Sequence, residues 1–329
     1  MGTTKNSHAR AVFLDFATLG PSGPGQLDAS ALLKVLPALE FIDSTPGNEI
    51  AERLNDAEFV LTNKARLGAP VLAGATKLRY IGLTATGTDN VDLDAARKRQ
   101  IAVTNIRAYC TRSVVEHVFA VLLNLTHSIR QYRQAVAAGD WRRSQDFCLL
   151  EYPIRELSAM TLGVVGYGEL GSAVAKMGEA FGMRTLIGRR RGAAASNDGR
   201  VDFQELLERS DVVSLHCPLR EETTNLLSAA EFGSMRRQSI LINTARGGLV
   251  DSQALVDALR DGKIAGAAID VLREEPPVNG DPLLDYEGAN LILTPHIAWG
   301  TIEARQNALD ELAGNVAAFL EGEERNRVV

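Results

Sequence analysis

The stretch Thr161-Leu-Gly-Val-Val-Gly-Tyr-Gly-Glu-Leu-Gly171 decides the fold of this 329-residue chain. An apolar run leads into a GxGxxG pattern at Gly166, Gly168 and Gly171, and a helical pattern then continues to Gly182, where a helix would end. A strand, a glycine turn and a helix in this order let backbone N–H groups meet a pyrophosphate at the helix N-terminus. Gly168 would permit close approach of the phosphates, and Gly171 would permit close packing of helix on strand. The stretch therefore predicts a dinucleotide-binding βαβ unit.

The end of the next apolar run, 185–188, bears on which dinucleotide binds. An acid about 20 residues past the glycines would bind the adenosine ribose and indicate NAD. Arg189, Arg190 and Arg191 stand there instead. An arginine can bind a 2′-phosphate through two parallel hydrogen bonds, so the pattern favours NADP(H), with NAD(H) as the alternative. A solvated surface turn is the other interpretation of such a charge run.

Short apolar runs alternate with amphipathic runs on both sides of this stretch. The strands expected outside it are 11–16, 59–62, 78–83, 101–104, 212–216, 240–243, 267–271 and 291–294. Helical patterns lie near 27–36 and 91–99, and a last one covers 302–320. This alternation predicts an α/β fold with two doubly wound parallel sheets. The pattern leaves open which of the two units the last helix joins.

One long helix is expected to begin near Ser113. Ser113 and Glu116 have the spacing of a capping box, and Val114, Val118 and Leu122 follow at helical spacing. Because the run is apolar on most sides, we expect the helix to be buried.

The composition excludes several classes of protein. The length suggests two domains, and the net charge of −6 gives no sign of a nucleic-acid-binding face. The chain has no apolar stretch of about 20 residues, and Met1 to Arg10 lacks the apolar core of a signal peptide. Cys110, Cys148 and Cys217 are an odd set without close spacing, which argues against a disulfide framework or a structural zinc site. We expect a cytoplasmic protein.

Three segments in the C-terminal half each place a reactive side chain just after an apolar run. They are Asn243–Arg246, Asp270–Glu275 and Thr294–Trp299. In open α/β sheets, ligands bind at the carboxyl ends of strands. We therefore expect an arginine, a glutamate and a histidine to converge there.

These three side chains suit the reduction of a 2-keto acid. Arg246 can bind the carboxylate and polarise the keto oxygen. His296 can donate the proton, and accept it in the reverse direction. Glu275 can hold the imidazole and stabilise its charged form. The arginine and the imidazolium supply the positive charge, so no metal is expected. Each residue alone has a structural interpretation, but three at successive strand ends favour a catalytic site.

These segments resemble the D-isomer-specific 2-hydroxyacid dehydrogenase family over nearly the whole chain. The resemblance implies that Arg246, Glu275 and His296 are the catalytic residues. It implies a Rossmann-type nucleotide-binding domain, residues 107–297, inserted into a flavodoxin-like substrate domain made of residues 1–106 and 298–329. It also implies domain closure over the ligand and a homodimer formed largely through the nucleotide-binding domain.

The resemblance extends to the binding residues. Thr84–Gly87 is similar to the loop whose amides receive the substrate carboxylate, Asn63 and Lys64 to the adjoining loop, and Thr111–Glu116 to the helix start beside the nicotinamide. The residues expected to bind the cofactor are Gly166, Gly168, Glu169, Leu170, Gly171, Arg189, Arg190, His216, Cys217, Pro218, Thr244, Ala245, Arg246, Asp270, His296 and Ala298. Those expected to bind the substrate are Asn63, Lys64, Thr86, Gly87, Arg246, His296 and Trp299.

Within the family, the segments 85–92, 296–299 and 323–328 look most like those of glycerate dehydrogenases, also called hydroxypyruvate reductases, which often reduce glyoxylate as well. The expected reaction is therefore reduction of hydroxypyruvate or glyoxylate to D-glycerate or glycolate. Arg189 departs from the acid that many members carry, which bears on the cofactor and not on the reaction class.

Three alternatives stay open. The substrate could be phosphoglycerate or a larger 2-keto acid, and Trp299 could line a pocket for a modest apolar side chain. Some relatives are cofactor-sensing corepressors that keep the arginine, glutamate and histidine. Formate or phosphite oxidation is the third alternative. Formate enzymes of this type carry glutamine where Glu275 stands, which argues against formate.

Overall fold

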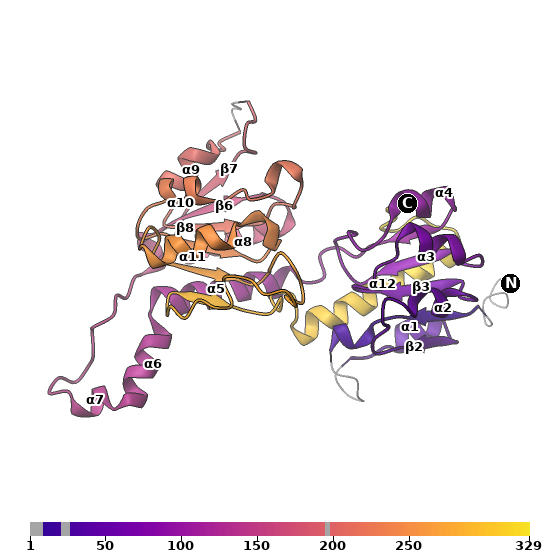
Figure 1. Cartoon of the computed structure of the whole chain (residues 1–329), viewed down its shortest axis with the longest axis horizontal. Helices are drawn as coiled ribbons and strands as arrows, with labels where there is room; N and C mark the ends of the chain where they lie inside the picture. Colours follow the sequence, from indigo (N-terminus) through magenta and orange to yellow (C-terminus); the bar gives the residue numbers. More distant parts are fainter. Residues whose placement is uncertain (1–8, 21–26, 195–197) are drawn as a thin grey trace. The chain divides into compact units, whose positions relative to one another are not determined.

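The computed structural model describes residues 9–20, 27–194 and 198–329, so most of the polar N-terminus lies outside the described part. The chain divides into two compact units (Figure 1). Unit 1 comprises Met1–Cys110 and Gly300–Val329, and unit 2 comprises Thr111–Trp299.

Unit 1 is built on a parallel sheet of five strands in the order β2-β1-β3-β4-β5. The strands are β1 (Ala11–Phe13), β2 (Leu39–Phe41), β3 (Phe59–Thr62), β4 (Tyr80–Leu83) and β5 (Ala102–Thr104). Its helices are η1 (Phe16–Leu19), α1 (Ser30–Val35), α2 (Ile50–Leu54), α3 (Ala69–Gly74), α4 (Leu93–Lys98) and α12 (Ile302–Glu321). The order is that of flavodoxin-like sheets, with the switch point between β1 and β3. The sequence pattern missed β2, a three-residue edge strand.

The last helix, α12, packs on the sheet of unit 1. The ring of Phe319 lies 5.8 Å from that of Phe59 and 4.8 Å from that of Tyr80. Gly82 makes room for the helix, since a Cβ there would lie 2.5 Å from a methyl group of Leu312. The last helix therefore belongs to unit 1, which the sequence pattern had left open.

Unit 2 is built on a parallel sheet of six strands in the order β11-β10-β9-β8-β6-β7. The strands are β6 (Thr161–Val165), β7 (Arg184–Gly188), β8 (Val212–Leu215), β9 (Ile240–Asn243), β10 (Gly266–Ile269) and β11 (Leu291–Leu293). The helices up to α8 are α5 (Thr111–Thr126), α6 (Ile129–Ala138), α7 (Asp140–Arg143), η2 (Leu157–Ala159) and α8 (Glu169–Ala180). Those after it are α9 (Phe203–Arg209), η3 (Glu221–Thr223), α10 (Ala229–Ser234), η4 (Gly247–Leu249) and α11 (Ser252–Arg260).

The strand order of unit 2 reverses between β6 and β8. A single parallel bridge between Gly188 and Val201 continues the sheet beyond β7. The central strands β6, β8, β9 and β10 are buried along their whole length, as expected for parallel strands with both faces covered. The two sheets confirm the predicted fold class, and they gather the strand-end segments of unit 2 at one edge of its sheet.

The capping box predicted at Ser113 is wrong. Helix α5 begins at Thr111, and Ser113 lies inside its first turn. The Ser113 hydroxyl donates instead to the carbonyl oxygen of Ala298, at 2.7 Å. The Ser113 side chain therefore makes a tertiary hydrogen bond and does not cap the helix as its spacing had predicted.

No helix in the described part of the chain is long and apolar enough to cross a membrane. Cys148 and Cys217 are free thiols.

Candidate active site

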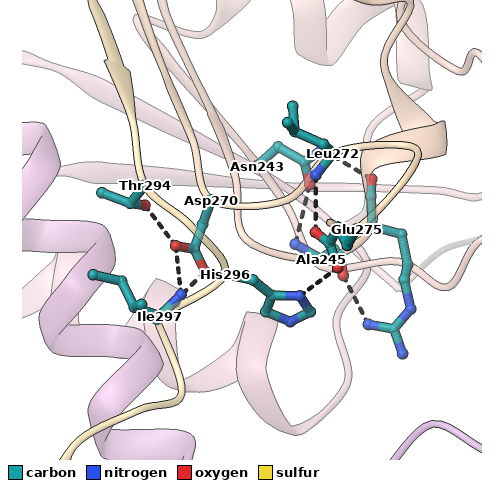
Figure 2. A network of polar contacts seen from close by, with 10 residues as sticks. Asn243, Ala245, Asp270, Leu272, Glu275, Thr294, His296 and Ile297 are labelled. Atoms are coloured by element: carbon teal, nitrogen blue, oxygen red, sulfur yellow. Dashed lines mark hydrogen bonds and ion pairs between the residues drawn. The ribbon is translucent and has the colours of Figure 1, made fainter. Parts of the chain in front are cut away.

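His296 and Glu275 form a direct pair at the carboxyl edge of the sheet in unit 2 (Figure 2). The distance from Nδ1 of His296 to Oε2 of Glu275 is 2.6 Å. The other oxygen, Oε1, accepts a hydrogen bond of 2.9 Å from the backbone N–H of Leu272. The side chains of His296 and Glu275 are 26% and 34% exposed, so a ligand can reach the pair. The carboxylate is thus fixed on one side and holds the imidazole on the other.

The loop that carries His296 is anchored by the buried carboxylate of Asp270. This carboxylate accepts hydrogen bonds from the hydroxyl of Thr294 (2.5 Å) and from the backbone N–H groups of Ile297 and Ala298 (2.9 Å each), as Figure 2 shows in part. His296 itself has a φ of 55°, a left-handed conformation that is rare for a residue other than glycine. Asp270 therefore stabilises the unusual turn that presents the imidazole.

The loop that carries Arg246 is braced by Asn243, the last residue of β9. Its amide nitrogen donates to the carbonyl oxygen of Arg246 at 2.9 Å, and its amide oxygen accepts from the N–H of Ala245 at 3.0 Å. The Arg246 guanidinium also donates to the carbonyl oxygen of Ala245, at 2.8 Å. Sequence reasoning quoted Asn243 without a role. Its position directly after an apolar run was the signal.

The Arg246 loop lies in backbone contact with the loop that carries Glu275. A Cβ on Gly247 would lie 2.0 Å from the carbonyl carbon of Leu272, so only glycine permits this approach. The structure thus brings His296 and Glu275 into direct contact and places Arg246 on the adjoining loop.

The glycine turn has the geometry that a dinucleotide site needs. Gly166 has a φ of 94°, and a Cβ there would lie 2.6 Å from the backbone of His216 and Cys217. A Cβ on Gly171 would lie 1.9 Å from the carbonyl oxygen of Gly166, which explains the close packing of α8 on β6. A Cβ on Gly168 would meet nothing within 4 Å. The turn is therefore tight against the protein at two glycines and open at the third, where phosphates would approach.

Buried polar atoms around the turn fit a cofactor. In the described ranges, Nε of Arg189, Nδ1 of His216 and Oγ1 of Thr244 are buried without a hydrogen-bond partner. Buried polar atoms are normally satisfied, so three such atoms among the predicted cofactor residues indicate a ligand. Burial lowers the pKa of His216 to about 4, and its Nε2 lies 2.8 Å from Oγ of Ser214. His216 is therefore a neutral hydrogen-bonding group here.

The other two arginines after β7 already have acidic partners. Arg190 is paired with Glu222, and Arg191 with Glu231 at 2.9 Å. Arg189 is the one of the three with a buried, unpartnered guanidinium nitrogen among the described atoms.

The remaining predicted residues of unit 2 lie in the same strand-end segments. Glu169 and Leu170 begin α8, Cys217 and Pro218 follow β8, and Trp299 follows Ala298 at the end of the His296 loop. Burial raises the pKa of the Cys217 thiol, so it is not a reactive nucleophile.

The predicted substrate residues of unit 1 lie on two neighbouring loops, after β3 and after β4. Thr62 pairs with Leu83 in the sheet, and the N–H of Thr84 donates to the carbonyl oxygen of Thr62 at 3.0 Å. Thr86 is held by its own hydroxyl, which donates to the carbonyl oxygen of Ile106 at 2.9 Å. The structure thus brings the loops of Asn63–Lys64 and Thr86–Gly87 together. Sequence reasoning missed Asp15, which holds the first of them. An acid at the end of a strand was the available signal.

Known proteins resemble this chain in sequence and in fold. Residues 119–298 match the sequence model described as "D-isomer specific 2-hydroxyacid dehydrogenase, NAD binding domain". The chain is 44% identical to the glycerate dehydrogenase of Methylorubrum extorquens, over 88% of this chain and 91% of that protein. It is 36% identical to the hydroxypyruvate reductase of Blautia hydrogenotrophica, over 93% and 96%. The crystal structure of the TT0316 protein from Thermus thermophilus superposes with a TM-score of 0.83, at 35% identity, over 97% of this chain and all of that one.

Proposed function

The chain belongs to the D-isomer specific 2-hydroxyacid dehydrogenase family, and on that premise we propose that it reduces hydroxypyruvate to D-glycerate and glyoxylate to glycolate. The chain is thus an oxidoreductase with an NAD(P)-binding domain. The observation that carries the proposal is the 2.6 Å contact between His296 and Glu275, beside the loop of Arg246.

Arg246, His296 and Glu275 each have a different role in the reaction. Arg246 binds the carboxylate and polarises the keto oxygen. Nδ1 of His296 faces Glu275, so it carries a proton that it donates to the carboxylate, and Nε2 is the nitrogen that gives a proton to the keto oxygen. Glu275 stabilises the imidazolium before this transfer. When bound, the nicotinamide supplies the hydride. In the reverse direction, Nε2 accepts the proton of the 2-hydroxyl group.

We assign cofactor binding to unit 2. Substrate-binding residues are assigned in each unit by itself, namely Asn63, Lys64, Thr86 and Gly87 in unit 1, and Arg246, His296 and Trp299 in unit 2. In unit 2 the glycine turn would hold the pyrophosphate, and the buried atoms of Arg189, His216 and Thr244 would contact the cofactor. The adjoining loops of unit 1 support its role, because they lie at the carboxyl ends of β3 and β4.

We further propose a preference for NADP(H). Arginines and not an acid stand directly after β7, and Arg189 keeps a buried Nε without a partner in the described ranges. A 2′-phosphate would give this guanidinium a charge-assisted partner. Since Arg190 and Arg191 are paired with Glu222 and Glu231, Arg189 carries most of the preference.

We propose that the protein is a homodimer that uses the arm formed by α6, α7 and the segment up to residue 155. Figure 1 shows this arm extending away from the sheet of unit 2. It exposes large apolar side chains, with Phe147 90% and Leu150 75% exposed. Apolar surface of this kind is typical of an interface with a second copy. Sedimentation of the Phe147→Ser, Leu150→Ser double variant should show monomers. A variant that stays dimeric would exclude the arm.

We propose a cytoplasmic location and no nucleic-acid partner. The free thiols of Cys148 and Cys217 suit a reducing compartment, and the net charge of −6 does not suit binding to a phosphate backbone.

Initial rates test the reaction. Hydroxypyruvate, glyoxylate, pyruvate and 3-phosphohydroxypyruvate are each offered with NADPH and with NADH. Fastest turnover of hydroxypyruvate or glyoxylate with NADPH supports the proposal. Fastest turnover of 3-phosphohydroxypyruvate or pyruvate would assign a different substrate to the enzyme, and preference for NADH would refute the role of Arg189. Cofactor binding without turnover would favour a cofactor-sensing binding protein.

A further inference from the structure

Asp15 is a buried acid at the end of β1, and it binds the backbone of the neighbouring loop. Its side chain and backbone are only 6% exposed. Oδ1 accepts from the N–H of Asn63 at 2.9 Å. Oδ2 accepts from the N–H groups of Lys64 (2.6 Å) and Ala65 (2.9 Å), and from the hydroxyl of Thr62 (3.1 Å). One carboxylate therefore organises four consecutive residues.

The position of this cluster is that of a ligand site. Strands β1 and β3 are neighbours in the sheet of unit 1, and the strand order changes direction between them. Ligands of open α/β sheets bind in the crevice at such a switch point, outside the carboxyl ends of the strands. Asp15 follows β1, and the loop that it holds follows β3.

A simple turn would not need a buried carboxylate at this place. Burying a charge is unfavourable unless hydrogen bonds compensate for it, and here three amides and one hydroxyl do so. Because Asp15 uses these amides, the loop meets a ligand with its side chains. Lys64 and Arg66 are the exposed residues of this loop, and Lys64 is the one whose backbone Asp15 holds; its ammonium group suits an anionic substrate.

The loop is also held from its other side, by Asn90. The amide nitrogen of Asn90 donates to the carbonyl oxygen of Ala65 at 3.0 Å, and its own carbonyl oxygen accepts from the N–H of Leu67 at 2.7 Å. Asn90 follows the second loop, that of Thr86 and Gly87. Hydrogen bonds thus join the first loop to Asp15 on one side and to Asn90 on the other.

We propose that Asp15 is the positioning residue of the substrate site in unit 1, fixing the backbone of residues 62–65 so that Lys64 faces the carboxylate end of the keto acid. The inference rests on the proposed function, because Lys64 was assigned to the substrate there.

The test compares Asp15→Asn with the wild type. The new amide nitrogen opposes either the N–H of Asn63 or those of Lys64 and Ala65, so the loop loses its fixed backbone. We expect the KM for hydroxypyruvate to rise by roughly 10–100-fold while kcat changes by less than about threefold, the signature of lost ground-state binding. The Kd for NADPH, measured by fluorescence titration, should stay within about twofold, because the cofactor residues lie in unit 2.

Two further variants keep the result interpretable. Thr62→Val removes one of the four hydrogen bonds and should raise the KM by about threefold, even if Asp15→Asn does not fold. Asp92→Asn is the matched control. Asp92 caps α4 by accepting from the N–H of Ala95 at 2.9 Å, and asparagine caps equally well, so its KM should not change.

The outcomes separate the two claims. A wild type that reduces no 2-keto acid refutes the proposed function and the role of Asp15 with it. An active wild type whose Asp15→Asn and Thr62→Val variants keep a normal KM refutes the role of Asp15 alone. A parallel loss of KM, kcat and cofactor affinity would make Asp15 a general structural residue and overturn the proposal.

Discussion

Replacing Glu275 by glutamine tests the central contact of the active site. The shape of the side chain is kept, and the amide oxygen can still accept from the N–H of Leu272, as Oε1 does at 2.9 Å. The amide nitrogen then takes the place of Oε2, which lies 2.6 Å from Nδ1 of His296. This nitrogen donates to a neutral imidazole and moves its proton to Nε2. It also repels the Nδ1–H of the imidazolium. Both effects oppose proton transfer from and to the substrate.

The size of the loss follows from the geometry of the pair. A hydrogen bond to a charged group contributes roughly 1.5–3 kcal/mol. The side chains are 26% and 34% exposed, so water screens part of this, and we take about 1.5–2 kcal/mol. At about 1.4 kcal/mol per factor of ten, kcat/KM should fall roughly 10–30-fold.

The assay is kcat/KM for hydroxypyruvate between pH 5 and 9, with Glu274→Gln as the matched control. Glu274 is the preceding acid and contacts the side chain of Asn279, at 2.9 and 3.0 Å, so its variant should keep the wild-type rate. A wild-type kcat/KM for Glu275→Gln would show that Glu275 is not the partner of His296 in catalysis.

Three more predictions follow from the structure. His296→Ala should lower kcat by about 10²–10⁴-fold while the Kd for NADPH changes little, and a smaller loss in single-turnover measurements would reject His296 as the acid. Arg189→Leu should raise the KM for NADPH roughly tenfold or more and leave that for NADH nearly unchanged, whereas Arg191→Leu, whose arginine is paired with Glu231, should affect neither cofactor strongly. Burial lowers the pKa of His216 to about 4 from 6.5, so between these values the unfolded chain binds a proton that the folded chain does not, and stability is lost as the pH falls through this window. The full loss is on the order of 3 kcal/mol, and thermal unfolding at pH 7 and pH 4.5 should show a smaller decrease for His216→Gln than for the wild type; equal decreases would disprove it.

Local features of the chain predicted much of the fold. The alternation of apolar and amphipathic runs predicted both parallel sheets, because strands buried on both faces must be apolar throughout. The glycine turn could be predicted from the spacing of its glycines, since a side chain at Gly166 or Gly171 would clash with nearby backbone. Edge strand β2 was not predicted, because it is short and partly exposed and so forms no continuous apolar run.

His296 and Glu275 could be named in advance as candidate residues, because parallel strands end at one edge of the sheet and each of them follows a strand. Their contact could not be predicted, since it depends on the turn of His296 that Asp270 holds. The approach of the Arg246 loop could not be predicted either, since it depends on the missing side chain of Gly247.

The sequence by itself thus determined the fold class and the family of this protein and predicted three reactive side chains, because these depend on patterns within short segments. The tertiary structure alone decided which polar groups are partners. In the folded chain Ser113 donates to Ala298 and does not cap a helix, Arg190 pairs with Glu222, and Asp15 accepts hydrogen bonds from the loop after β3. These interactions join residues that are far apart in the chain. A hydrogen bond or an ion pair depends on distances of a few ångströms, and only the folded chain sets these distances.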